Sequence, residues 1–114
     1  MQMAIIGAGK WGQALYHAFS QKNDVVIHSR TVRELEHFVS LEKALERDYL
    51  VMAIPAQFVR RWMEEHFIDH GQKILVAAKG IETATGAFLN DIFTCFLPEE
   101  RLAYISGPSF AAEV

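Results

Sequence analysis

The chain has 114 residues, of which 51% are hydrophobic, so it is long enough for one hydrophobic core and too short for two. A formal charge of −3 argues against an electrostatic nucleic-acid binder. Its apolar stretches fall short of the roughly 20 residues that span a bilayer, the N-terminus lacks an export signal, and the single cysteine, Cys95, excludes an intrachain disulfide or thiolate metal cluster. These features predict one cytoplasmic domain that acts on small molecules.

Short apolar strands alternate with amphipathic helices along the sequence. The apolar runs predict strands over 3–6, 25–27, 49–54, 73–77 and 102–105. Helical spacing predicts helices over 11–19, 31–38, 41–47, 55–67 and 86–96, with Ser40 as the cap of the third and Pro55 at the start of the fourth. Residues 38–39 also fit a vestigial strand.

Apolar side chains at helical spacing predict the inward face of three helices. These residues are Trp11, Ala14, Leu15, Ala18 and Phe19; Phe58, Val59, Trp62, Met63 and Phe67; and Phe88, Leu89, Ile92, Phe93 and Phe96. Strands that alternate with helices, without hairpin signals, indicate right-handed crossovers. We therefore expect an α/β fold of the Rossmann type, a doubly wound, mostly parallel sheet that forms a single domain.

The stretch GAGKWG at residues 7–12 follows the first strand and opens the first helix. In this G-x-G-x-x-G pattern Gly7 allows the tight turn, Gly9 lets a pyrophosphate approach the backbone, and Gly12 lets the helix pack on the strand. Unpaired N–H groups at the helix start point at the phosphates. The pattern predicts a dinucleotide site; the alternative is that the glycines serve only the geometry of the turn.

The end of the second strand normally distinguishes NAD from NADP, because a carboxylate there binds the ribose 2'-hydroxyl of NAD. This sequence has no acid at residues 28–31. Ser29 would hydrogen-bond a 2'-phosphate, and Arg30, together with Arg33, would supply a planar fork of donors. NADP is therefore favoured over NAD. The alternatives are that the arginines face solvent, or that one stacks on adenine without selecting the phosphate.

Lys79 is the charged group at the end of the predicted strand 73–77, where its ammonium would face the cleft and attract an anionic substrate. A merely solvated lysine is the alternative. The histidines show no paired metal spacing, and no Ser or Cys nucleophile motif is present. We expect no metal site.

Taken in order, several segments resemble the bacterial type of NAD(P)-dependent glycerol-3-phosphate dehydrogenase. They are GAGKWGQAL at 7–15, AIP at 53–55, AKGIE at 78–82 and SGPSFAAEV at 106–114. The resemblance covers essentially the whole chain but only the nucleotide-binding half of the family. It implies reversible hydride transfer between NAD(P)H and dihydroxyacetone phosphate, which gives sn-glycerol 3-phosphate for phospholipid synthesis.

The resemblance also implies roles for individual residues. Lys10 and Trp11 would line the turn at the cofactor diphosphate, and Arg30 would lie by the adenosine end. Lys10 stands where the family usually has a small hydroxyl residue and adds a positive charge, and the segment 30–50 is shorter than in the family.

On the substrate side, Lys79 would contact both cofactor and substrate, Gly107 and Ser109 would contact the substrate, and Ala111 would lie beside the nicotinamide. The family's general acid/base lysine belongs to a helical domain after Val114, so no catalytic residue is expected within residues 1–114. A domain that normally covers this one implies exposed apolar surface, and we expect the isolated chain to form a homodimer or to aggregate.

Two hypotheses of different kinds follow. The first is the N-terminal domain of a glycerol-3-phosphate dehydrogenase. The second is a stand-alone dinucleotide-binding module without catalysis. Within the first, enzymatic hypothesis, the alternative is another small NAD(P)-dependent reductase, such as ketopantoate or pyrroline-5-carboxylate reductase.

Overall fold

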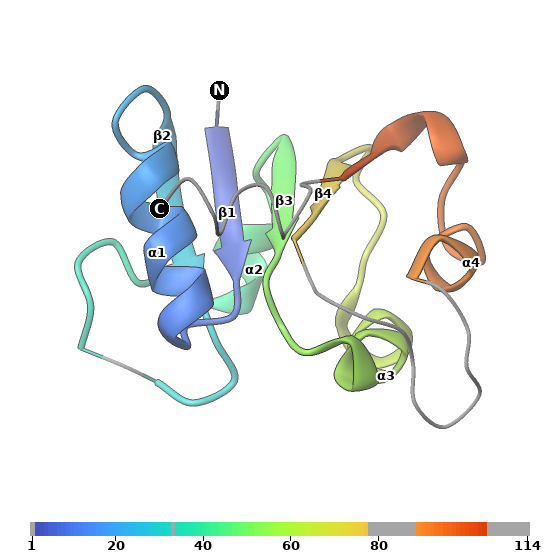
Figure 1. Cartoon of the computed structure of the whole chain (residues 1–114), viewed down its shortest axis with the longest axis horizontal. Coiled ribbons are helices and arrows are strands. Elements are labelled where there is room, and N and C mark those ends of the chain that lie inside the picture. The colour runs from blue at the N-terminus through green and yellow to red at the C-terminus, as the bar shows by residue number, and fades with distance from the viewer. Residues whose placement is uncertain (1, 33, 78–88, 105–114) are drawn as a thin grey trace.

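A computed structural model describes residues 2–32, 34–77 and 89–104 of the chain. Their strands form one parallel sheet in the order β2-β1-β3-β4-β5 (Figure 1). The bounds are β1 Gln2–Ile6, β2 Asp24–His28, β3 Tyr49–Met52, β4 Lys73–Val76 and β5 Leu102–Tyr104. The expected parallel α/β sheet is confirmed.

Helices cover both faces of this sheet. They are α1 Lys10–Phe19, α2 Leu41–Leu45, α3 Ala56–His66 and α4 Leu89–Phe93, and a short 3-10 helix, η1 Glu99–Arg101, precedes β5. Leu15 of α1 packs on one face, in a cluster with alternate residues of β1, β2 and β3. On the other face α2, α3 and α4 pack on the intervening strand residues (Figure 1). Because both faces are covered, the central strands β1 and β3 are apolar and buried over residues 3–6 and 50–52.

A vestigial strand extends the sheet at its β2 edge. Phe38 forms an isolated parallel bridge with Ile27, for which the N–H of Ile27 donates to the His37 carbonyl at 3.0 Å and the N–H of Val39 donates to the Ile27 carbonyl at 2.9 Å. If this bridge is counted as a strand, the order becomes the 3-2-1-4-5-6 arrangement of dinucleotide-binding sheets. The prediction of a vestigial strand at residues 38–39 is confirmed.

The helix predicted over 31–38 is wrong for the described residues, which form bends and a turn there. Hydrogen bonding to the edge of β2 requires the His37 carbonyl and the Val39 N–H to face Ile27, and His37 adopts a left-handed φ of 61°. A helix can satisfy neither requirement. The next helix is confirmed in a shorter form, and the hydroxyl oxygen of Ser40 accepts from the Lys43 N–H at 3.4 Å as its cap.

The predicted inward faces are partly confirmed. Leu15, Val59, Met63, Ile92 and Phe93 are buried. The predictions for Ala14, Ala18 and Phe58 are wrong, because all three side chains are exposed. In α1 the closest contact with the sheet is made by Gly12 and Leu15, which turns the two alanines outward. Phe88 lies outside the described residues, and the side chain of Leu89 is not described.

The amino ends of β4 and β5 are held by one polar side chain. Gln72 is 2% exposed, and its amide nitrogen donates to the carbonyl oxygens of Leu45 at 3.1 Å and Ile68 at 3.0 Å. Its amide oxygen accepts from the His70 N–H at 2.8 Å. The Gln72 carbonyl in turn accepts from the Arg101 guanidinium, which also pairs with Asp69 at 2.7 Å. This network joins the turns before β3, β4 and β5.

None of the helices among the described residues has the length and apolarity needed to cross a membrane.

Candidate functional site

The carboxyl ends of four strands lie level at one edge of the sheet. The register pairs Ile6 with both His28 and Met52, and Met52 with Val76. The connections that follow these strands therefore start side by side, and backbone bonds tie them together: Gly7 donates to His28 at 2.8 Å, and Ala53 donates to Ile6 at 2.9 Å. Ligands of open parallel sheets bind at this edge, so we call it the cofactor edge.

Two of the three glycines in the turn are required by the fold itself. Gly7 has a φ of +115°, and a side chain there would bring its Cβ to 2.9 Å from the Ala53 carbonyl oxygen. A Cβ at Gly12 would overlap the Gly7 carbonyl oxygen. The absence of a side chain at Gly7 lets the turn pass close to the Ala53 carbonyl, just after β3. The absence of a side chain at Gly12 lets α1 pack directly on the turn. Their roles in turn geometry and close packing are thus explained without any ligand.

Gly9 differs from both, because a Cβ at this position would meet no atom of the described residues within 4 Å. Gly9 is the N-cap of α1, has an extended backbone, and contributes no side-chain cap. The first turn of α1 contains no acidic residue and carries the exposed Lys10. A helix N-terminus has unpaired N–H groups and a partial positive charge, which suit an anion. The space above Gly9 is therefore open at the point where a phosphate would approach.

Trp11 connects the glycine turn to the end of β4. Its indole Nε1 donates to the carbonyl oxygen of Ala77 at 2.7 Å. A second bond braces the turn, since the side-chain amide of Gln13 donates to the Ala8 carbonyl at 2.8 Å. The start of α1 is thereby held against the strand end that leads to Lys79. The sequence motif predicts that Trp11 lies at the turn, but it does not predict this contact with a residue 66 positions away.

The end of β2 presents the residues that were expected to select the cofactor. Ser29 is half-buried and its hydroxyl donates to the Thr31 carbonyl at 2.5 Å, whereas Arg30 is exposed. A 2'-phosphate is an acceptor, so Ser29 would have to exchange this partner to bind one. The hydrogen bond from Arg61 is the largest cause that lowers the pKa of Glu65, and the charge of Arg30 adds to it.

Phe58 is an aromatic residue of this edge that sequence reasoning assigned to the core. It lies in the first turn of α3, close after the end of β3, and is 53% exposed. The signal that identifies it is positional: Ala56 and Val59 already supply the buried contacts of this turn. An exposed ring at a cofactor edge offers a flat apolar surface to a base.

Several predicted site residues lie outside the described part of the chain. They are Arg33, Lys79, Gly107, Ser109 and Ala111. Ala77, two residues before Lys79, is buried at the carboxyl end of β4. Within the described ranges no three His, Cys, Asp or Glu side chains are placed to hold a metal ion.

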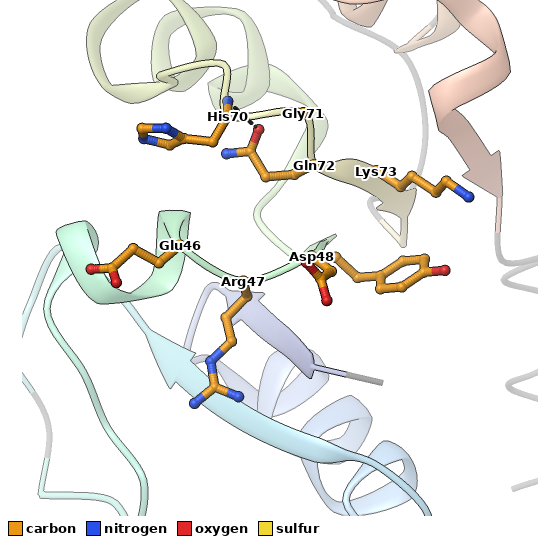
Figure 2. A pocket seen from close by; sticks show the side chains of 8 residues that line it. Glu46, Arg47, Asp48, His70, Gly71, Gln72 and Lys73 are labelled. Carbon is orange, nitrogen blue, oxygen red and sulfur yellow. Dashed lines mark hydrogen bonds between the residues drawn. The ribbon is translucent and has the colours of Figure 1, made fainter.

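A cavity of about 330 Å³ lies at the opposite, amino edge of the sheet (Figure 2). Its lining includes Arg47, His70, Gln72 and Lys73. Figure 2 shows the Arg47 and Lys73 side chains pointing away from each other, and Arg47 pairs with Asp24 at 3.2 Å. Because these side chains do not converge on a common point, the cavity is not the candidate site.

Known proteins match this sequence and this fold. The family model described as NAD-dependent glycerol-3-phosphate dehydrogenase N-terminus matches residues 32–114. The glycerol-3-phosphate dehydrogenase [NAD(P)+] of Sulfurimonas denitrificans is 56% identical over 113 residues, which are 99% of this chain and 38% of that protein. The chain therefore spans well under half the length of this relative.

Two solved structures share the architecture. Glycerol-3-phosphate dehydrogenase of Coxiella burnetii superposes with a TM-score of 0.64 at 25% identity, over 98% of this chain and 42% of that one. D-mandelate dehydrogenase in complex with NADH gives a TM-score of 0.65 at 20% identity, over 91% and 38%. The second similarity concerns the fold alone.

Proposed function

The chain belongs to the family of NAD-dependent glycerol-3-phosphate dehydrogenases, whose N-terminal part it matches, and we propose that it forms the dinucleotide-binding domain of such an enzyme. Residues 1–114 would bind NAD or NADP. A helical domain after Val114 would supply the general acid/base lysine, and the complete enzyme would convert dihydroxyacetone phosphate and sn-glycerol 3-phosphate into each other in the cytoplasm.

The observation that carries this proposal is the contrast within the glycine turn. Gly7 and Gly12 are required by neighbouring backbone, but nothing in the described structure occupies the space that a side chain at Gly9 would fill. That space adjoins the N-terminus of α1, to which Lys10 adds a positive charge. A diphosphate fits this surface in both shape and charge.

The parts of the cofactor would then follow the edge of the sheet. The adenosine would lie over the end of β2 by Ser29 and Arg30, with Phe58 available to its base, and the diphosphate would lie over Gly9. Trp11 would position the turn through Ala77 rather than through the cofactor. The nicotinamide would lie beside Ala111. When bound, the reduced cofactor supplies the hydride that reduces the carbonyl carbon of the substrate.

On the substrate side, we infer that the ammonium of Lys79 attracts the anionic substrate and that Gly107 and Ser109 contact it. Rapid transfer requires the donor and acceptor carbons to be held in a near-attack arrangement. Residues 1–114 would supply one wall of that arrangement. The chain alone should therefore bind cofactor better than it catalyses.

The first experiment compares NADPH with NADH by fluorescence titration of the 114-residue chain. Since Arg30 offers a fork of donors to a 2'-phosphate, we expect tighter binding of NADPH, and Arg30→Ala should weaken NADPH binding by about tenfold while leaving NADH within about twofold. Arg61→Ala, which removes an exposed arginine paired with Glu65 on α3, is the matched control. Equal or tighter binding of NADH would refute the preference for NADP.

The second experiment concerns Lys79 and uses the complete enzyme. Lys79→Ala, made at the equivalent lysine of a two-domain relative, should lower kcat/KM for dihydroxyacetone phosphate by at least roughly tenfold, or about 1.4 kcal/mol of transition-state binding. Lys73→Ala, at the amino end of the same strand, should have little effect. An unchanged kcat/KM would remove Lys79 from the site.

A stand-alone binding module remains the competing hypothesis, and the gene distinguishes the two. An open reading frame that continues past Val114 into a helical domain with the lysine supports the dehydrogenase, whereas a stop codon at that point refutes it for this chain.

We also propose that the isolated domain forms a homodimer through apolar surface. Analytical ultracentrifugation of the dilute chain tests this, and a sample that sediments entirely as monomer would contradict it.

A further inference from the structure

The loop that carries Ser29 and Arg30 is tied to α1 by one pair of side chains. The Tyr16 hydroxyl lies 2.5 Å from Nδ1 of His37. The pair joins the body of α1 to the end of the loop, across 21 positions of sequence. Tyr16 also packs with Leu35 and Phe38 against the same buried cluster. We call Tyr16 and His37 the clasp.

Backbone and side-chain bonds fix the same end of the loop to β2. The His37 carbonyl accepts from Ile27, and Val39 donates to Ile27. Nδ1 of His28 lies 2.9 Å from the Val39 carbonyl oxygen. The described residues 29–32 and 34–36 thus lie between two anchored ends, and most of them, Arg30 among them, are exposed.

His37 holds a conformation that a side-chain-bearing residue rarely adopts. Its φ of 61° lies in the left-handed region. Such residues persist when their surroundings hold them, and they are found preferentially at ligand clamps and switch regions. At His37 the backbone is held by β2 and the imidazole by Tyr16.

The electrostatics of Tyr16 suit its contact with His37. Burial raises the pKa of Tyr16, and the negative charge of Glu36 raises it further. The hydroxyl keeps its proton at neutral pH, and because a phenol can donate or accept, it can pair with Nδ1 in either tautomer of the ring. Nε2 of His37 lies 4.0 Å from the Glu36 carboxylate.

We propose that Tyr16 and His37 are positioning residues that hold Arg30 ready for the 2'-phosphate of NADP without contacting the cofactor themselves. The inference rests on the proposed function of Arg30. An exposed loop held at both ends loses less conformational entropy when a ligand orders it, and a preorganised donor binds more tightly for that reason. The preference for NADPH over NADH should therefore depend on α1 as well as on the loop.

The test measures NADPH and NADH dissociation constants for variants of the full chain. Tyr16→Phe should weaken NADPH binding about fivefold and leave NADH within about twofold, because one hydrogen bond is lost. Tyr49→Phe removes a hydroxyl at the amino edge of the sheet and should change neither constant. His37→Gly should reproduce Tyr16→Phe without added backbone strain. His37→Asn should retain binding close to wild type, since Asn tolerates positive φ and keeps a polar atom near the position of Nδ1.

A double-mutant cycle separates a positioning role from a general structural one. In the Arg30→Ala background, Tyr16→Phe should no longer affect NADPH binding. If Arg30→Ala alone leaves NADPH binding unchanged, the proposed role of Arg30 fails. If Arg30→Ala weakens binding but Tyr16→Phe has no effect, or has the same effect in both backgrounds, the clasp is not a positioning device. The inference is also overturned if Tyr16→Phe weakens the binding of NADPH and NADH by the same factor.

Discussion

Gly12→Ala should lower the free energy of unfolding by about 3 kcal/mol or more, the upper range for an overpacked core site. The added Cβ would overlap the Gly7 carbonyl oxygen and lie 2.8 Å from the Gly7 carbonyl carbon. Both atoms belong to backbone that is itself bonded to β2 through Gly7. No side chain can move to relieve the overlap, so α1 would have to leave the turn. Chemical denaturation followed by circular dichroism measures the loss.

Gly9→Ala is the matched control within the same turn. Because a Cβ there meets no atom within 4 Å in the part of the chain that the structure describes, the free energy of unfolding should stay within about 0.5 kcal/mol of wild type. Cofactor binding should nevertheless weaken by at least roughly tenfold, since the methyl group takes the space of the diphosphate. Gly12→Ala with wild-type stability would contradict the geometry of the turn. Gly9→Ala with unchanged cofactor binding would contradict the placement of the diphosphate.

Gln72→Leu should lower the free energy of unfolding by about 2 to 4 kcal/mol. Leucine has a similar volume but leaves the carbonyl oxygens of Leu45 and Ile68 and the N–H of His70 without their partner. These are backbone groups that the substitution cannot remove, so their desolvation penalty remains. Thermal and denaturant unfolding measure the change.

Gln21→Leu controls for the chemistry of this substitution. The Gln21 side chain is exposed and donates to the His17 carbonyl at 3.2 Å, where water can replace it, so the expected change is within about 0.5 kcal/mol. If Gln72→Leu is as stable as Gln21→Leu, the buried network does not hold the amino ends of β4 and β5 as we describe.

Within the described residues, the sheet and the glycine turn were predictable because the signals are local. Apolar runs of three to six residues between helical patterns define the strands, and those in the middle of the sheet are buried on both faces. The steric requirement at Gly12 is local in sequence, because its close neighbour is Gly7, whereas the requirement at Gly7 also involves the distant Ala53. The position of Gly9 at the helix start follows from the same short stretch, so its candidate role did not depend on the tertiary structure.

The helix predicted over 31–38 shows where local signals fail. The sequence of this segment tolerates a helix, but the edge of β2 offers Ile27 as a hydrogen-bond partner for the His37 carbonyl and the Val39 N–H, and pairing with it excludes a helix at these residues. Likewise Phe58 has the spacing of a core residue but lies beyond the contacts made by Ala56 and Val59. Whether a segment follows its local helical preference or pairs with a strand depends on which partners the folded chain brings next to it.

The sequence alone thus determined the parallel α/β architecture, the glycine turn and the resemblance to a dehydrogenase family, since each rests on residue type and short spacing. The tertiary structure decided how that turn is held, through the bond from Trp11 to Ala77, and how the loop of Arg30 is anchored, through Tyr16 and His37. These contacts join residues 66 and 21 positions apart. Periodicity and motif spacing carry no information about such pairs, because only the packing of α1 on the sheet brings them within hydrogen-bonding distance.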